Sequence, residues 1–189
     1  MMGTKKIGIL VGSLRKESFN RKIAEAVKVM APESFEMEEV ELGALAIYNQ
    51  DLDDEGNPPQ AWMDFREKIS RYDAFLYVTP EYNRSVPALL KNALDVASKP
   101  LGKNAWGRKP AGVISVSPGA LGGFGANHHL RQILVCLNVP TMPSETYIGN
   151  AATLFNEDGT LADEKTKEHL KKFMLNFAVW VEKNARTEV

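Results

Sequence analysis

Four polar side chains that could bind a phosphate group lie close together near the start of the chain. Ser13, Arg15, Ser18 and Asn20 follow the apolar run 7–11. Hydroxyl and amide groups donate hydrogen bonds, and the guanidinium adds a permanent positive charge. The apolar run is typical of a buried parallel strand, and the residues after the loop have helical spacing. Because a strand, a polar loop and a helix N-terminus direct backbone N–H groups at one point, the segment predicts an anion site.

Two well-known phosphate-binding motifs are absent from the sequence. There is no G-x-x-x-x-G-K-[ST], which excludes a nucleoside-triphosphate P-loop, and no G-x-G-x-x-G, which argues against a Rossmann dinucleotide site. A monophosphate held by hydroxyls and one arginine fits the segment better. Taken alone, the segment is equally compatible with a βα turn whose serine and asparagine only cap a helix.

The composition favours one soluble globular domain that covers residues 1–189, with 44% hydrophobic and 25% charged residues. A net charge of −1 argues against a nucleic-acid binder. No apolar run approaches the roughly 20 residues that span a membrane, and the first residues do not form a signal peptide. We therefore expect a cytoplasmic protein without a membrane partner.

The cysteine and histidine content gives no indication of a metal site. The chain has one cysteine and three histidines, without metal-ligand spacing. Cys136 is the only cysteine, so an internal disulfide is excluded, which fits a reducing compartment. Its apolar surroundings, I-L-V-C-L, predict a small core residue rather than a nucleophile.

The hydrophobic pattern predicts strands that alternate with helices. Strands are expected at 7–11, 35–42, 74–78, 111–116 and within 141–148. Helices are expected around 23–30, 62–72, 85–98, 126–138 and 170–181, and the acidic stretch 48–59 is expected to be a solvated loop. This alternation indicates a flavodoxin-like three-layer α/β/α fold with a five-stranded parallel sheet of order 2-1-3-4-5.

Three loops are expected at one edge of that sheet, because the carboxyl ends of parallel strands lie together. They comprise residues 12–20, 80–84 and 117–125. Ligands of such sheets bind at this edge. A phosphate loop with two further loops beside it forms a slot for a flat ring, and FMN is the cofactor with that outline.

Two of these loops carry long motifs. G-S-L-R-K-E-S-F-N follows the first strand, and T-P-E-Y-N-R-S-V-P follows the third. Together with Y-N-Q-D-L after the second strand and H-L-R-Q-I-L in the fourth main helix, they resemble the NAD(P)H-dependent FMN reductase family over nearly the whole chain. The most similar branch is that of the bacterial chromate, quinone and ferric reductases.

The resemblance implies a role for each loop. The first loop would hold the FMN phosphate and ribityl chain with Ser13, Arg15, Ser18, Phe19 and Asn20. The second would wrap the isoalloxazine with Pro80, Glu81, Tyr82 and Asn83. The third would approach the ring with Ser117, Gly119 and Gly122. Tyr82 is also compatible with a packed aromatic, and Glu81 with an acid at a helix start. Arg84 and Lys99 are candidate substrate contacts, the latter only across an interface.

The resemblance also implies an enzyme that works by a ping-pong mechanism. NADH or NADPH would reduce FMN, and small-molecule acceptors would then take the electrons. Quinones, azo and nitro compounds, ferric complexes and chromate are the implied acceptors. An alternative is a flavodoxin-type electron carrier, but the strongly acidic composition and the T-G-T-like phosphate loop of such carriers are absent. A third hypothesis is a binding module that has lost the flavin.

The helix expected at 126–138 suggests an oligomer, because apolar residues surround most of its axis. The helix expected at 85–98 adds Leu94 and Val96 to its core-facing residues. We therefore expect a homodimer or homotetramer in which a neighbouring chain covers these helices and walls the active site. The alternative is that the last helix or the segment 149–160 covers them within one chain.

Overall fold

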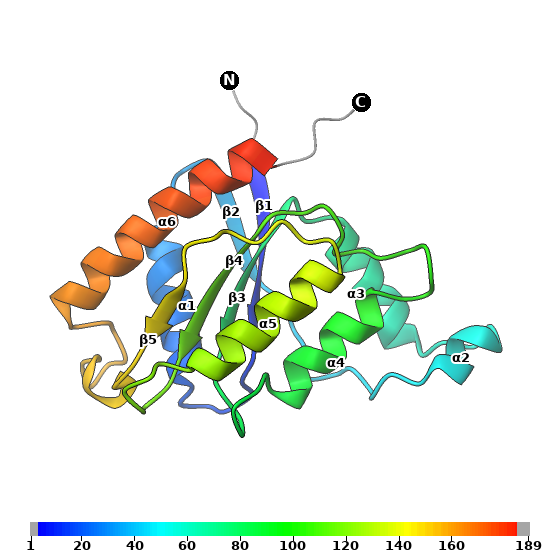
Figure 1. Cartoon of the computed structure of the whole chain (residues 1–189), viewed down its shortest axis with the longest axis horizontal. Helices are drawn as coiled ribbons and strands as arrows, with labels where there is room; N and C mark the ends of the chain where they lie inside the picture. Colours follow the sequence, from blue (N-terminus) through cyan, green and yellow to red (C-terminus); the bar gives the residue numbers. More distant parts are fainter. Residues whose placement is uncertain (1–3, 185–189) are drawn as a thin grey trace.

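The computed structural model describes residues 4–184 and contains one parallel sheet (Figure 1). Its strands are β1 (Lys5–Val11), β2 (Phe35–Glu39), β3 (Ala74–Thr79), β4 (Ala111–Val116) and β5 (Thr146–Ile148). Their order is β2-β1-β3-β4-β5, and every neighbouring pair is parallel. The fold class and strand order predicted from the sequence are confirmed.

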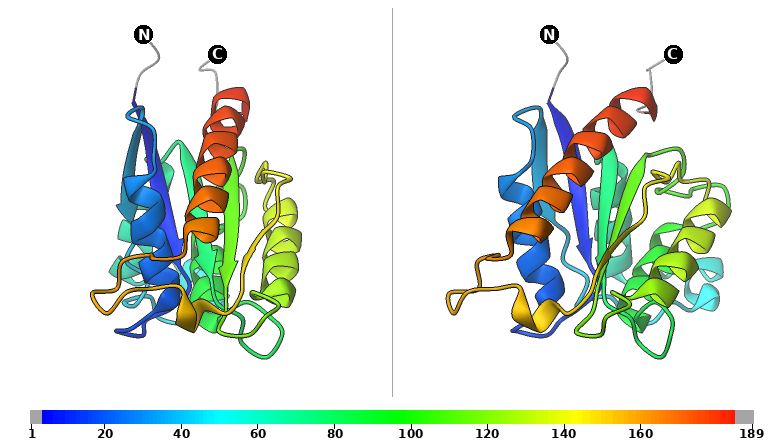
Figure 2. Two further views of the ribbon diagram at one scale, coloured as in Figure 1. Left: turned by 90° about the vertical axis from the view of Figure 1, so that its left-hand side faces the viewer. Right: turned by 60° about the vertical axis from the view of Figure 1, so that its left-hand side comes forward.

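Helices cover both faces of the sheet (Figures 1 and 2). They are α1 (Phe19–Val29), α2 (Gln50–Asp54), α3 (Gln60–Ser70), α4 (Ala88–Ala97), α5 (Phe124–Cys136) and α6 (Glu164–Asn184), with a short 3-10 helix at Ala151–Thr153. α1 and α6 pack on one face, and α3, α4 and α5 pack on the other. Because β1, β3 and β4 are parallel neighbours, the loops that follow them lie together at one edge of the sheet.

The burial of each strand reflects its place in the sheet. All six residues of the central strand β3 are buried, whereas β2 at the edge alternates between half-buried and exposed positions. The apolar stripe of α6 packs against β4 on one face of the sheet, as its spacing predicts. This stripe consists of Leu170, Phe173, Met174, Phe177 and Val181.

Several element boundaries differ from the predicted ones. β2 ends at Glu39 rather than Leu42, because the chain then crosses to the other face, where Val40 and Leu42 are buried. α4 begins at Ala88 rather than near Ser85, because the preceding residues form a tight turn and the helix starts only after Pro87. These differences shift helix and strand ends by a few residues without changing the topology.

The sequence predicts a solvated loop at 48–59, but only part of this stretch is one. It contains α2, which begins after Asn49, whose side chain accepts a hydrogen bond from the Asp51 backbone N–H at 3.1 Å. Asp53 is largely buried and forms two hydrogen bonds with the guanidinium of Arg66, at 2.7 and 2.8 Å. Arg66 also donates to the carbonyl of Val96 at 2.9 Å. This ion pair fastens the segment to α3 and α4.

The burial of three residues on α4 and α5 differs from the predicted one. Leu94 and Val96 are fully buried within the chain, where Trp106 donates a hydrogen bond to the Leu94 carbonyl at 3.0 Å. They therefore need no cover from a second chain. Cys136 is exposed rather than part of the core, because it lies on the outer side of the last turn of α5.

The core contains one buried hydroxyl with no hydrogen-bond partner in the described part of the chain, that of Tyr77. Burial raises the pKa of this phenol well above its ordinary value. A buried donor without a partner costs roughly 1–3 kcal/mol. We therefore expect Tyr77→Phe to raise the free energy of unfolding by about 1 kcal/mol or more. Urea denaturation measures this change, and a lower midpoint for the variant would contradict it.

Candidate functional site

The loops after β1, β3 and β4 line a pocket of about 230 Å³ at the carboxyl edge of the sheet. It brings together nine of the twelve cofactor-binding residues that the sequence predicts. These are Ser13, Arg15, Ser18, Phe19, Asn20, Pro80, Glu81, Tyr82 and Ser117. The pocket therefore joins segments that are up to about a hundred residues apart in the chain.

The first loop ends at the N-terminus of α1, which faces this pocket. Ser18 is the N-cap of the helix, and its hydroxyl accepts a hydrogen bond from the Arg21 backbone N–H at 3.3 Å. The first backbone N–H groups of a helix have no partner within it, so they are available to an anion. Ser13 is buried beside them, whereas Arg15 is exposed at the edge of the pocket.

The second loop forms a tight turn between Tyr82 and Ser85, whose backbones exchange two hydrogen bonds of 2.9 and 3.0 Å. The two residues between them, Asn83 and Arg84, have positive φ angles of 50° and 66°. This is the conformation that a two-residue hairpin of type I′ requires, and it is unusual for arginine. Backbone in such a conformation persists only where surrounding contacts hold it.

The Glu81 side chain supplies one of those contacts. Its Oε2 accepts a hydrogen bond from the Ala126 backbone N–H at 3.1 Å, and its Oε1 lies 3.4 Å from Arg84 Nη1. Gly123, the N-cap of α5, provides no side-chain cap. A Cβ at Gly125 would lie 2.7 Å from the Arg84 carbonyl, so a glycine is needed for α5 to approach the hairpin. Glu81 thus does act as a helix-start acid, for α5.

The third loop is shaped by packing against β5. The Ser117 hydroxyl accepts a hydrogen bond from the Gly119 backbone N–H at 3.1 Å. Gly122 has a positive φ of 58°, and a Cβ there would lie 2.9 Å from the Ile148 nitrogen. Gly119 and Gly122 do not line the pocket, so in this structure they shape the loop and do not face the proposed ring site.

The remaining predicted residues lie outside the pocket. Asn83 and Arg84 are exposed at the hairpin tip. Lys99 follows Ser98, the C-cap of α4, at the end of the helix opposite to the hairpin. The pocket includes two residues that the sequence reasoning missed, Val116 and Pro118. Both residues flank Ser117 at the end of a buried strand, and this position could have identified them as pocket residues.

Within residues 4–184, no group of three or more His, Cys, Asp or Glu side chains is placed to hold a metal ion. No helix in the same range is long and apolar enough to cross a membrane.

The family model of the NADPH-dependent FMN reductases matches residues 5–153, which include all three loops of the pocket. The chain belongs to this family. The family, the FMN cofactor and the class of NAD(P)H-dependent oxidoreductase predicted from the sequence are thereby confirmed.

Similar proteins support this assignment along the chain. The chain is 55% identical over 179 residues to a quinone reductase from Pseudomonas putida, covering 94% of this chain and 95% of that protein. It is 41% identical to a 2-hydroxy-1,4-benzoquinone reductase from Burkholderia sp, over 93% and 96% of the two chains. The structure of the flavoenzyme NAD(P)H:(acceptor) oxidoreductase FerB from Paracoccus denitrificans is similar with a TM-score of 0.88 at 37% identity, covering 97% and 100%.

In this FMN reductase, the pocket has polar groups that suit FMN. The Asn20 Oδ1 atom is buried in the first turn of α1, beside the first loop, and has no hydrogen-bond partner within the described residues. Because a buried acceptor without a partner is costly, a ligand hydroxyl that donates to it is the natural complement. The N-terminus of α1 and Arg15 suit the phosphate, and Pro80 and Tyr82 offer apolar surface to a ring.

Proposed function

We propose that this FMN reductase oxidises NADH or NADPH and reduces quinones at FMN bound between the three loops. The observation that carries the proposal is the pocket that nine predicted residues line together. When bound, FMN supplies the hydride-accepting and electron-donating chemistry. The quinone reductases to which the chain is similar support quinones as acceptors. Azo and nitro compounds, ferric complexes and chromate are further candidate acceptors of the same site.

The side chains have binding roles in this proposal. Ser13, Ser18 and the N-terminus of α1 hold the phosphate, and Asn20 accepts a hydrogen bond from a ribityl hydroxyl. Pro80 and Tyr82 hold the ring against the hairpin. The two co-substrates use the same face in turn, which gives ping-pong kinetics. No side chain has to act as a nucleophile or a general acid.

Anaerobic stopped-flow mixing of the FMN-loaded enzyme with NADH or NADPH tests this function. The visible absorption of the flavin should bleach rapidly and return when a quinone is added. Absence of bleaching with either nucleotide would refute the proposal. Slow bleaching together with fast electron exchange with a reductase protein would instead support the flavodoxin-type carrier.

We further propose that residues 1–189 act as one cytoplasmic domain on small molecules, without a nucleic-acid or membrane partner. The net charge of −1 and the single cysteine support this. We also propose a homodimer or homotetramer. The outer side of α5 and the loop before it expose Leu121, Phe124 and Val135 by 63%, 51% and 73%. Lys99 would reach a flavin only from a neighbouring chain.

A charged residue on this outer side of α5 is expected to dissociate the oligomer. Val135→Glu places a carboxylate where the proposed interface excludes water, at a position whose side chain is 73% exposed in the single chain. Light scattering should give a smaller mass for the variant, and turnover should fall with it. A wild-type mass near 21.0 kDa at micromolar concentration with full activity would refute the assembly.

A further inference from the structure

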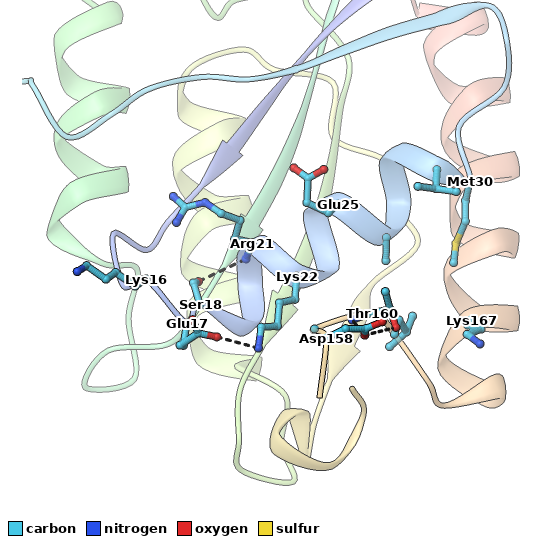
Figure 3. A pocket seen from close by; sticks show the side chains of 14 residues that line it. Lys16, Glu17, Ser18, Arg21, Lys22, Glu25, Met30, Asp158, Thr160 and Lys167 are labelled. Atoms are coloured by element: carbon cyan, nitrogen blue, oxygen red, sulfur yellow. Dashed lines mark hydrogen bonds and ion pairs between the residues drawn. The ribbon is translucent and has the colours of Figure 1, made fainter. Parts of the chain in front are cut away.

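A second and larger pocket, of about 580 Å³, lies along the outer side of α1 (Figure 3). α1 contributes more of its lining residues than any other element, and the turn at 158–161 closes it from below in the figure. Lys167 reaches it from the first turns of α6. Its volume is within the range of about 300–1,000 Å³ that small-molecule sites occupy. Nothing in the proposed flavin site accounts for it.

Neighbouring residues of the same loop line the two pockets. Arg15 lines the smaller pocket, whereas Lys16 and Glu17 line the larger one. Ser18 lines both. A molecule that crosses this loop would therefore reach from one pocket into the other.

The larger pocket combines an apolar floor with a charged rim. Ala26, Met30 and Leu161 form part of the floor, next to Val29, which is 89% exposed. The rim carries both signs of charge. Its cations are Lys16, Arg21, Lys22 and Lys167, and its carboxylates are Glu17, Glu25 and Asp158.

The carboxylate partners of two rim lysines are loosely held. Lys22 Nζ lies 3.1 Å from Glu17 Oε2, and Lys167 Nζ lies 2.7 Å from Glu164 Oε1. The two glutamate side chains are 79% and 76% exposed, so water screens both ion pairs. The lysines can therefore exchange these partners for a ligand phosphate at little cost. Hydrogen bonds from Thr160 lower the pKa of Asp158, which stays charged and able to accept from a hydroxyl.

We infer that the larger pocket binds the adenosine end of NADPH while its nicotinamide reaches FMN in the smaller pocket. This inference rests on the proposed function. The apolar floor suits a purine, and the carboxylates suit the ribose hydroxyl and amino donors of a nucleoside. Lys22 and Lys167 lie at opposite ends of the pocket (Figure 3). Lys22, at the end shared with the smaller pocket, binds the pyrophosphate, and Lys167 binds the 2′-phosphate, the group that distinguishes NADPH from NADH. A simple anion would use the lysines but not the floor.

Isothermal titration of the FMN-loaded enzyme with adenosine 2′,5′-bisphosphate tests the site without turnover. Lys22→Ala and Lys167→Ala should each weaken binding about tenfold or more, as for a lost hydrogen bond to a charged group. Lys171→Ala is the matched control, because Lys171 is exposed on α6 and lies outside the pocket lining. Equal affinity of the wild type and both pocket variants would overturn the inference.

Steady-state kinetics separate this inference from the proposed function. Lys167→Ala should raise KM for NADPH about tenfold and leave KM for NADH nearly unchanged, whereas Lys22→Ala should raise KM for both nucleotides. Ala26→Phe, which fills the floor, should raise KM for both nucleotides. Reduced nicotinamide mononucleotide has no adenosine, so its rate of flavin reduction should be the same in every variant. Normal reduction by this mononucleotide with unaltered KM values would overturn the adenosine site alone. No reduction by any donor would overturn the proposed function.

Discussion

Arg15→Ala is expected to weaken FMN binding by about 1.5–3 kcal/mol, the value of a hydrogen bond to a charged group. Arg15 lines the proposed flavin pocket at its exposed edge, beside the N-terminus of α1. Its guanidinium takes part in no ion pair within residues 4–184, so it is available to the FMN phosphate. Fluorescence quenching of FMN titrated with apoprotein measures the change.

Riboflavin provides the internal control for Arg15, because it carries the same ring and ribityl chain without the phosphate. Its affinity should be nearly the same for the wild type and the variant. Lys16→Ala is the matched control and should leave FMN affinity nearly unchanged, because this neighbouring cation lines the larger pocket. Equal losses for FMN and riboflavin would show that Arg15 acts on something other than the phosphate.

Asp53→Ala is expected to lower the free energy of unfolding by about 3–5 kcal/mol, because it leaves the Arg66 guanidinium buried without its carboxylate. The side chains of Arg66 and Asp53 are only 14% and 5% exposed. Thermal or urea unfolding at neutral pH measures the loss. The double variant Asp53→Leu/Arg66→Met should recover most of it, because it removes both charges from the interior.

The effect of Asp53→Ala should also depend on pH. Hydrogen bonds from Arg66 hold the pKa of Asp53 below its ordinary value in the folded protein. A carboxyl with a lowered folded pKa stabilises the protein above its unfolded pKa of about 3.9, and this stabilisation is lost as the pH falls through the folded pKa. The difference in free energy of unfolding between wild type and variant should therefore be largest near pH 7 and shrink below about pH 4. A constant difference across this range would exclude an ionised pair.

The outer side of α5 marks one limit of prediction from sequence. Apolar residues surround this helix, so its periodicity does not indicate which side faces the sheet. Cys136 and Val135 are exposed, whereas Leu130 and Leu134 are buried. The sheet decides between them, because only one side of the helix can pack on β4.

The strand order of this FMN reductase and the loop proposed to bind phosphate could both be predicted from local sequence patterns. The buried strands, the alternation with helices and the loop from Ser13 to Asn20 are all local in the chain, so patterns of a few residues predict them. The tertiary structure decided the contacts between distant segments. Glu81 caps α5 through Ala126, 45 residues away, and the larger pocket joins α1 to the turn before α6. No local pattern reports such pairs, because they depend on how helices approach one another across the sheet edge.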